Sequence, residues 1–233
     1  MAVAQATLVR SALLRTAGTS VARPFPTLFT VPGLAARPFW DVDDIPLVGR
    51  VVAAIDDIRV EYANAARHAP NDYQTTDGEH KLHRGNWAWR SIVTKGVLQP
   101  AMTTLCPKTA AALLHPDLLV DSVPFAYAFF STLHAGAEIA PHYGPSNIRL
   151  RVHIPLEVPS VDANVCGLSV GGHVRAWDRP LVFDDSFEHS TWNRSASERA
   201  VLLFDVWHPE LAADERAAIT RMFDGARAAG WLK

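Results

Sequence analysis

Apolar residues follow the helical period in the first half of the chain. Between Asp41 and Ala66 they predict one long helix, with Asp41 or Asp44 as its cap; they are Val48, Val51, Val52, Ile55, Ile58, Val60 and Ala63. A second helix is predicted over 107–115, ending near Pro116, and a third over 211–229, a stretch rich in Ala, Arg and Glu. A polar loop, 68–84, follows the first helix.

The stretch 121–208 predicts short strands instead. Residues 148–156 alternate strictly, so that Arg149, Arg151 and His153 share one face and aliphatic residues share the other. Gly171-Gly172 is a hairpin turn signal. Further strands are expected at 125–133, 166–170, 173–177, 181–183 and 200–207. Many short strands at this spacing are typical of a barrel or a double-sheet jelly roll, a mostly β (α+β) fold.

Composition restricts the class of protein. The chain has 233 residues, of which 48% are apolar and 20% charged, as expected for a single globular domain. A net charge of −2 offers no electrostatic footprint for nucleic acid or anionic lipid. The two cysteines form no CxxC motif, which argues against a disulfide scaffold or a zinc ribbon. The apolar runs are too short for a membrane-spanning helix, and we expect a cytoplasmic protein.

The first 40 residues contain arginines but no acidic residue. This composition resembles an organellar transit peptide, or else a weakly ordered start of the domain. We favour the second interpretation, because Pro24, Pro26 and the turn-like 31–33 argue against one continuous amphipathic helix. The predicted organisation is therefore an extension, 1–25, followed by one domain, 26–233.

The candidate chemistry lies in the strand-rich part. Arg149, Arg151 and His153 either face water from an edge strand or point into the fold, where cations need partners. His142 precedes this strand by a turn, and His189 follows later. Imidazoles from two strands can bind Fe(II), and arginines bind carboxylates in bidentate geometry. Together they suit a dicarboxylate that chelates iron, such as 2-oxoglutarate.

The sequence resembles the aspartyl/asparaginyl β-hydroxylase family of Fe(II)/2-oxoglutarate oxygenases. The resemblance rests on three blocks: His142-Tyr-Gly-Pro-Ser-Asn-Ile-Arg-Leu-Arg-Val-His153, Leu181-Val-Phe-Asp-Asp-Ser-Phe-Glu-His189, and Asp205-Val-Trp-His-Pro-Glu-Leu211 together with Arg199. It implies a double-stranded β-helix jelly roll, flanked by helices from the N-terminal half. It also implies hydroxylation of an unactivated C–H bond, with O2 and 2-oxoglutarate consumed and succinate and CO2 released.

The resemblance also implies roles for particular residues. His142 and His189 look like the iron ligands. Arg199 and Ser131 look like the clamp on the far carboxylate of 2-oxoglutarate, and Arg151 and His153 like contacts to its metal-bound end. Arg149 shares their face and is predicted to reach the substrate. Asp184, Asp185 and Glu188 are expected to be structural.

The substrate implied by the family is the β-carbon of an Asp or Asn side chain, in an amino acid, a short peptide or another small molecule. Gly144 stands where most related oxygenases carry a carboxylate ligand, so a coordination position is expected to be open. An Asp there is expected to be at least partly tolerated, unless the Tyr143-Gly144-Pro145 turn needs the backbone freedom of glycine, in which case Asp would misplace His142. The same vacancy occurs in iron halogenases, which leaves halogenation as a rival reaction. A non-catalytic metal-binding relative and a cupin-like protein with another metal are further alternatives.

Overall fold

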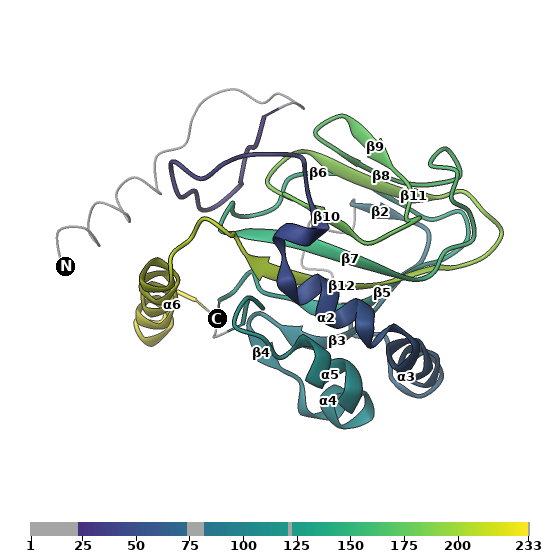
Figure 1. Cartoon of the computed structure of the whole chain (residues 1–233), viewed down its shortest axis with the longest axis horizontal. Helices are drawn as coiled ribbons and strands as arrows, with labels where there is room; N and C mark the ends of the chain where they lie inside the picture. Colours follow the sequence, from purple (N-terminus) through teal and green to yellow (C-terminus); the bar gives the residue numbers. More distant parts are fainter. Residues whose placement is uncertain (1–22, 74–81, 121–122, 233) are drawn as a thin grey trace.

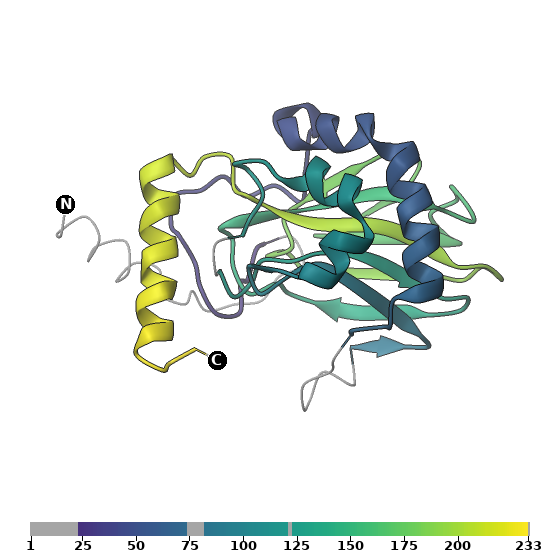
Figure 2. The ribbon, with the colours of Figure 1, turned by 90° about the horizontal axis from the view of Figure 1, so that it is seen from below.

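The computed structural model describes residues 23–73, 82–120 and 123–232. Two antiparallel β-sheets lie face to face, helices α2 to α5 lie along one side of the larger sheet, and α6 lies beside the strand ends (Figures 1 and 2). No helix within these described ranges is long and apolar enough to cross a membrane. The extension predicted at 1–25 falls almost entirely outside the described residues.

The larger sheet has seven strands. In spatial order they are β1 (Phe39–Trp40), β10 (Leu181–Phe183), β7 (Arg149–Glu157), β12 (Arg199–Trp207), β5 (Ala128–Leu133), β3 (Trp87–Thr94) and β4 (Val97–Leu98). The smaller sheet runs β2 (His83–Arg84), β6 (Glu138–His142), β11 (His189–Asn193), β8 (Cys166–Val170) and β9 (His173–Arg175). From β5 to β12 the chain passes repeatedly from one sheet to the other. This winding is that of a double-stranded β-helix, and the predicted jelly roll is confirmed.

The predicted helix over 41–66 is divided into three pieces: η1 (Val42–Asp44), α2 (Pro46–Ala53) and α3 (Ile55–His68). The break falls at Ala54, whose φ of −100° and ψ of 11° leave the helical region. Pro46 begins α2 because proline is tolerated in the first turn of a helix. The helical period continues across the break, which explains why the pattern predicted a single helix.

Two further short helices, α4 (Pro100–Leu105) and α5 (Pro107–Leu113), also begin with proline. Glu61 of α3 caps α5: its carboxylate accepts from the backbone nitrogens of Lys108 at 2.9 Å and Thr109 at 2.8 Å. A carboxylate at a helix N-terminus satisfies N–H groups that have no partner within the helix. The last helix, α6 (Ala213–Ala228), agrees closely with the predicted third helix.

Strand β7 separates two apolar cores. Leu150, Val152 and Ile154 face the helices and belong to the core beneath α2, α3 and α5. Arg149, Arg151 and His153 face the space between the sheets, which has its own aromatic and aliphatic core. Because β7 lies between β10 and β12, the alternative of an edge strand whose arginines face water is wrong. The Gly171-Gly172 turn is confirmed: it joins β8 to β9, and both glycines have positive φ.

Candidate active site

The two predicted metal ligands lie side by side on neighbouring strands of the smaller sheet. His142 at the end of β6 and His189 at the start of β11 are partners in the strand register, and their ring centroids are 4.0 Å apart. His142 Nδ1 lies 2.8 Å from Ala140 O, and His189 Nδ1 lies 3.0 Å from Phe187 O. Since a carbonyl oxygen can only accept, each Nδ1 carries the proton. Each lone pair is therefore on Nε2, the atom that imidazole presents to a metal.

Burial keeps His189 neutral. The residue is 6% exposed, and burial, reinforced by the adjacent His142, holds the pKa of His189 well below its ordinary value. A neutral imidazole is the form that ligates a metal. Within the described ranges, no three His, Cys, Asp or Glu side chains form a metal-binding group, so the candidate centre consists of this histidine pair.

Gly144 lies against a carboxylate rather than beside empty space. A Cβ at this position would stand 2.5 Å from Cγ of Asp185, and the Gly144 nitrogen donates to Asp185 O at 2.6 Å. Asp185 is fully buried and cannot move aside, because two arginines hold its carboxylate. The expectation that Asp would be tolerated at position 144 is therefore wrong on steric grounds. The Asp185 carboxylate, engaged with Arg149 and Arg151, fills the space beside Gly144.

Arg149, Arg151, Asp185 and Asp205 form a buried network of four charges. Arg149 donates to both carboxylates and to Phe125 O, with its NH1 3.0 Å from Asp205 Oδ2. Arg151 lies 2.9 Å from Asp205 through Nε and 3.4 Å from Asp185 through NH1. Although burial opposes the charged form, the two arginines hold the pKa of Asp185 well below its usual value. Two cations and two anions thus balance inside the fold.

This network bears on two predicted roles. The Arg149 side chain is only 3% exposed and is engaged with protein acceptors, so the substrate contact expected of it stays a prediction that its present position does not favour. The Arg151 side chain is 16% exposed and keeps an accessible edge. Asp205 had no predicted role, and both aspartates are distant in sequence from the arginines they neutralise.

Arg199 is a buried cation without an anionic partner in the described part of the chain. It is 1% exposed, its NH1 lies 3.5 Å from Ser131 Oγ, and its Nε has no hydrogen-bond partner. The guanidinium lies over the ring of Trp177, 4.6 Å from the centroid. Burial lowers the pKa of Arg199 to about 10. Ser131 also accepts from Trp87 Nε1 at 2.9 Å, so that the predicted clamp residues, Arg199 and Ser131, are adjacent.

His153 presents a second unsatisfied donor. Trp177 Nε1 donates to His153 Nδ1 at 3.2 Å, which leaves the proton of the neutral ring on Nε2, and this buried atom has no partner. Burial and the nearby cations of Arg199 and Arg151 hold the pKa of His153 well below its ordinary value. The ring of Phe183 lies between His153 and His189, with centroids 5.0 and 5.9 Å away.

These donors fit the group that the resemblance implies. Buried N–H groups without acceptors are rare in folded proteins, and an anion with several oxygens would satisfy those of Arg199 and His153 together. The structure thus brings Ser131, Arg199 and His153 to one region of the interior. It adds Trp177, which contacts both donor residues and was not predicted. No local pattern marks Trp177, because its contacts are with residues 22 and 24 positions away.

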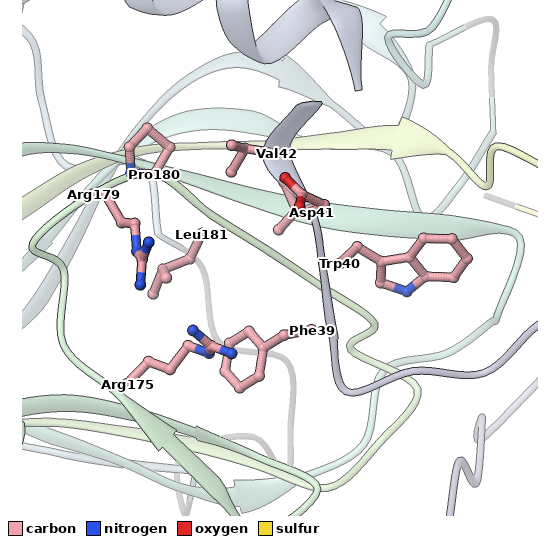
Figure 3. Close-up of a pocket in the computed structure, with 9 residues that line it drawn as sticks. Phe39, Trp40, Asp41, Val42, Arg175, Arg179, Pro180 and Leu181 are labelled. Carbon is pink, nitrogen blue, oxygen red and sulfur yellow. The ribbon is translucent and has the colours of Figure 1, made fainter. Parts of the chain in front are cut away.

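A separate hollow lies at the edge of the larger sheet. Phe39, Leu181 and the side chains of Arg175 and Arg179 surround it, next to Asp41 (Figure 3). The Arg175 guanidinium lies 4.7 Å from the centroid of Phe39. Neither candidate metal ligand lines this hollow, so it is distinct from the histidine pair.

Two neighbouring imidazoles, together with buried N–H donors that have no acceptor between the sheets of a jelly roll, are the arrangement that the resemblance predicts. A model of the aspartyl/asparaginyl beta-hydroxylase family matches residues 53–209. The chain therefore belongs to this family.

Two curated relatives illustrate the relationship. Aspartate beta-hydroxylase domain-containing protein 2 of Mus musculus is 32% identical over 215 residues, which cover 87% of this chain and 60% of the relative. Aspartyl/asparaginyl beta-hydroxylase of the same species is 30% identical over 198 residues, which cover 83% of this chain and 26% of the relative. The chain thus spans less than two thirds of the length of the first relative and about a quarter of the length of the second.

Solved structures show more distant likenesses. A Trichoplax adhaerens prolyl hydroxylase in complex with a peptide fragment of hypoxia inducible factor has a TM-score of 0.45 at 11% identity, covering 71% of this chain and 81% of that one. An oxidoreductase of the 2OG-Fe(II) oxygenase family from Burkholderia pseudomallei has a TM-score of 0.42 at 13% identity, covering 78% and 100%.

Proposed function

We propose that the chain is an Fe(II)- and 2-oxoglutarate-dependent dioxygenase that hydroxylates an unactivated C–H bond. The observation that supports it most is the pairing of two imidazoles, each with its lone pair on Nε2, with the unsatisfied buried donors of Arg199 and His153. Iron supplies the O2 chemistry when it is bound. By family membership, the preferred substrate is the β-carbon of an Asp- or Asn-like residue in an amino acid or peptide.

The chain's own residues bind and orient the reactants. His142 and His189 hold Fe(II) through Nε2, and the carbonyls of Ala140 and Phe187 fix the orientation of the rings. Arg199 and Ser131 bind the far carboxylate of 2-oxoglutarate from one end. At the other end, His153 donates from Nε2 and Arg151 adds a positive charge. The rings of Trp177 and Phe183 belong to the core between the sheets and exclude water from the contacts that His153 and Arg151 make.

We propose hydroxylation rather than halogenation as the reaction. Asp185 fills the side of the site where a residue-144 side chain would enter, and Arg149 and Arg151 neutralise its carboxylate. Family membership favours hydroxylation, so we expect turnover to be independent of chloride.

The test is a substrate screen that reads succinate and product mass together. Asp- and Asn-containing peptides and the free amino acids are incubated with Fe(II), 2-oxoglutarate and O2, in chloride-containing and chloride-free buffers. Hydroxylation predicts iron-dependent succinate and a product heavier by one oxygen in both buffers. A chlorinated product would establish the halogenase instead. His142→Ala and His189→Ala should each abolish turnover, and near-full activity in either folded variant would refute the ligand assignment.

A further inference from the structure

A short N-terminal segment, residues 25–31, crosses the loops that carry both candidate metal ligands; we call it the strap. The backbone nitrogen of Phe25 donates to Ser186 O at 2.7 Å, three residues before His189. The nitrogens of Thr27 and Leu28 donate to Gly144 O and Pro145 O at 3.1 and 3.0 Å, just after His142. Three consecutive strap residues, 25–27, therefore contact the loop before His189 and the loop after His142.

Asn147 fastens the far end of the strap. Its Oδ1 accepts from the Val31 nitrogen and its Nδ2 donates to Val31 O, both at 2.8 Å. One side chain thus satisfies both backbone groups of a strap residue, and it sits five residues after His142. At the near end the ring of Phe25 packs edge-on against Tyr143, with centroids 5.8 Å apart.

The strap is anchored on α6 as well as on the ligand loops. Phe29 packs against Phe223 of α6, and both belong to a core that includes Ile148 at the base of the His142 loop. Figure 2 shows the purple N-terminal segment running between α6 and the strand ends. Both the strap and α6 lie outside the 53–209 range that matches the family.

We propose that the strap is a positioning element for the metal site, with Asn147 as the side chain that fastens it. The proposal rests on the proposed function, in which His142 and His189 bind the metal. The 143–147 loop is non-regular chain, and a loop holds a ligand only as well as its supports allow. Loss of groups that orient metal ligands typically weakens metal binding by about 10- to 100-fold. The strap supplies that orientation through the loop backbone.

The experiment compares Asn147→Ala with Asn164→Ala in the full chain. Asn164 is a surface residue whose side chain bonds only locally, to Asp162, and the substitution is chemically identical. Co(II) is titrated as the metal probe, and its visible absorption gives a dissociation constant without turnover. We expect Co(II) binding about tenfold weaker in Asn147→Ala and unchanged in Asn164→Ala. We also expect unchanged 2-oxoglutarate affinity at saturating metal, because Arg199 and Ser131 lie on the other sheet.

Asn147→Asp is a second, nearly isosteric variant that guards against a folding defect. Aspartate keeps an acceptor for the Val31 nitrogen but places a carboxylate oxygen against Val31 O in place of the donor, so its metal affinity should also be below that of wild type. Both variants are checked by urea unfolding, and affinities are compared only for folded protein. Wild-type Co(II) affinity in a folded Asn147 variant would overturn the proposal. If His142→Ala and His189→Ala also bind Co(II) as wild type does, the proposed function fails as well; if they lose it, only the strap proposal fails.

Discussion

Removing the charge of Arg199 should make the ligand-free protein more stable. We consider Arg199→Met, which keeps an unbranched side chain of similar length and removes the guanidinium. In the described structure this cation has only long contacts to Ser131 and the face of Trp177 to offset its burial. An ion held in the interior without an opposite charge is costly, and an apolar replacement of similar shape removes that cost.

The magnitude follows from the pKa of Arg199, which burial lowers to about 10 from the ordinary 12.5. Because one pKa unit corresponds to about 1.4 kcal/mol, burial disfavours the charged form by about 3 kcal/mol. A base whose pKa is lowered by folding carries this cost at every pH below the folded value, so the full cost is present at neutral pH. Arg199→Met also removes the favourable interactions with Ser131 and Trp177, which reduces the net gain, and we expect an increase of about 1–3 kcal/mol.

The assay is urea unfolding at pH 7, with and without 2-oxoglutarate in the presence of a redox-inert divalent metal. Wild type should be stabilised by 2-oxoglutarate through mass action, whereas Arg199→Met should start higher and gain nothing. The control is Arg90→Met: Arg90 donates to Ala66 O and Ala69 O, so its loss should lower stability. A less stable Arg199→Met that still responds to 2-oxoglutarate would refute the reasoning.

Three other outcomes are expected. Burial raises the pKa of Asp184 to about 7, so the free energy of unfolding should fall as pH rises from 4 to 7. Urea unfolding across pH should show that Asp184→Asn removes this dependence and is up to about 4 kcal/mol more stable than wild type at pH 8. Gly144→Ala should lower the free energy of unfolding by about 1–3 kcal/mol, since its Cβ would overlap Asp185, and a stability equal to wild type in the same assay would contradict this steric argument. Trp177→Phe, which removes the donor to His153 but keeps a ring, should weaken 2-oxoglutarate binding about tenfold by calorimetry, whereas an unchanged affinity would exclude this role for the indole.

The strands that carry the predicted metal ligands, β6 and β11, are among those that the sequence pattern did not predict; β1 to β4 are the others. In β11 the buried positions His189, Thr191 and Asn193 are all polar, so the apolar alternation that marks an ordinary strand is absent. Strand β6 is short and contains Pro141. Local rules fail here because the buried positions are polar, as expected where residues serve the proposed site rather than a core. Strand β7 was predictable because its helix-facing positions are regularly aliphatic.

Partners that lie far apart in the sequence were beyond prediction. Alternation along the strand showed that Arg149 and Arg151 share a face. It did not show that Asp185 and Asp205, which lie 36 and 56 residues beyond Arg149, neutralise them. Gly144 is a similar case. Its lack of a side chain predicted open space beside it, but Asp185, 41 residues later in the chain, fills that space. Spacing along a chain predicts which residues share a face, whereas folding decides what lies opposite.

The division of the site between the two sheets makes the core between them a spacer of fixed thickness. The candidate metal ligands stand on the smaller sheet, and Ser131, Arg151, His153 and Arg199 stand on the larger one. The separation of the proposed metal contacts from the proposed cosubstrate contacts is therefore set by the side chains that fill the gap, Phe129, Leu168, Phe183 and Leu203 among them. A change of volume in this layer shifts one half of the site relative to the other. A substitution in the core beneath the helices that costs the same stability leaves that separation intact. At equal loss of stability, substitutions between the sheets should therefore lower activity more than substitutions beneath the helices.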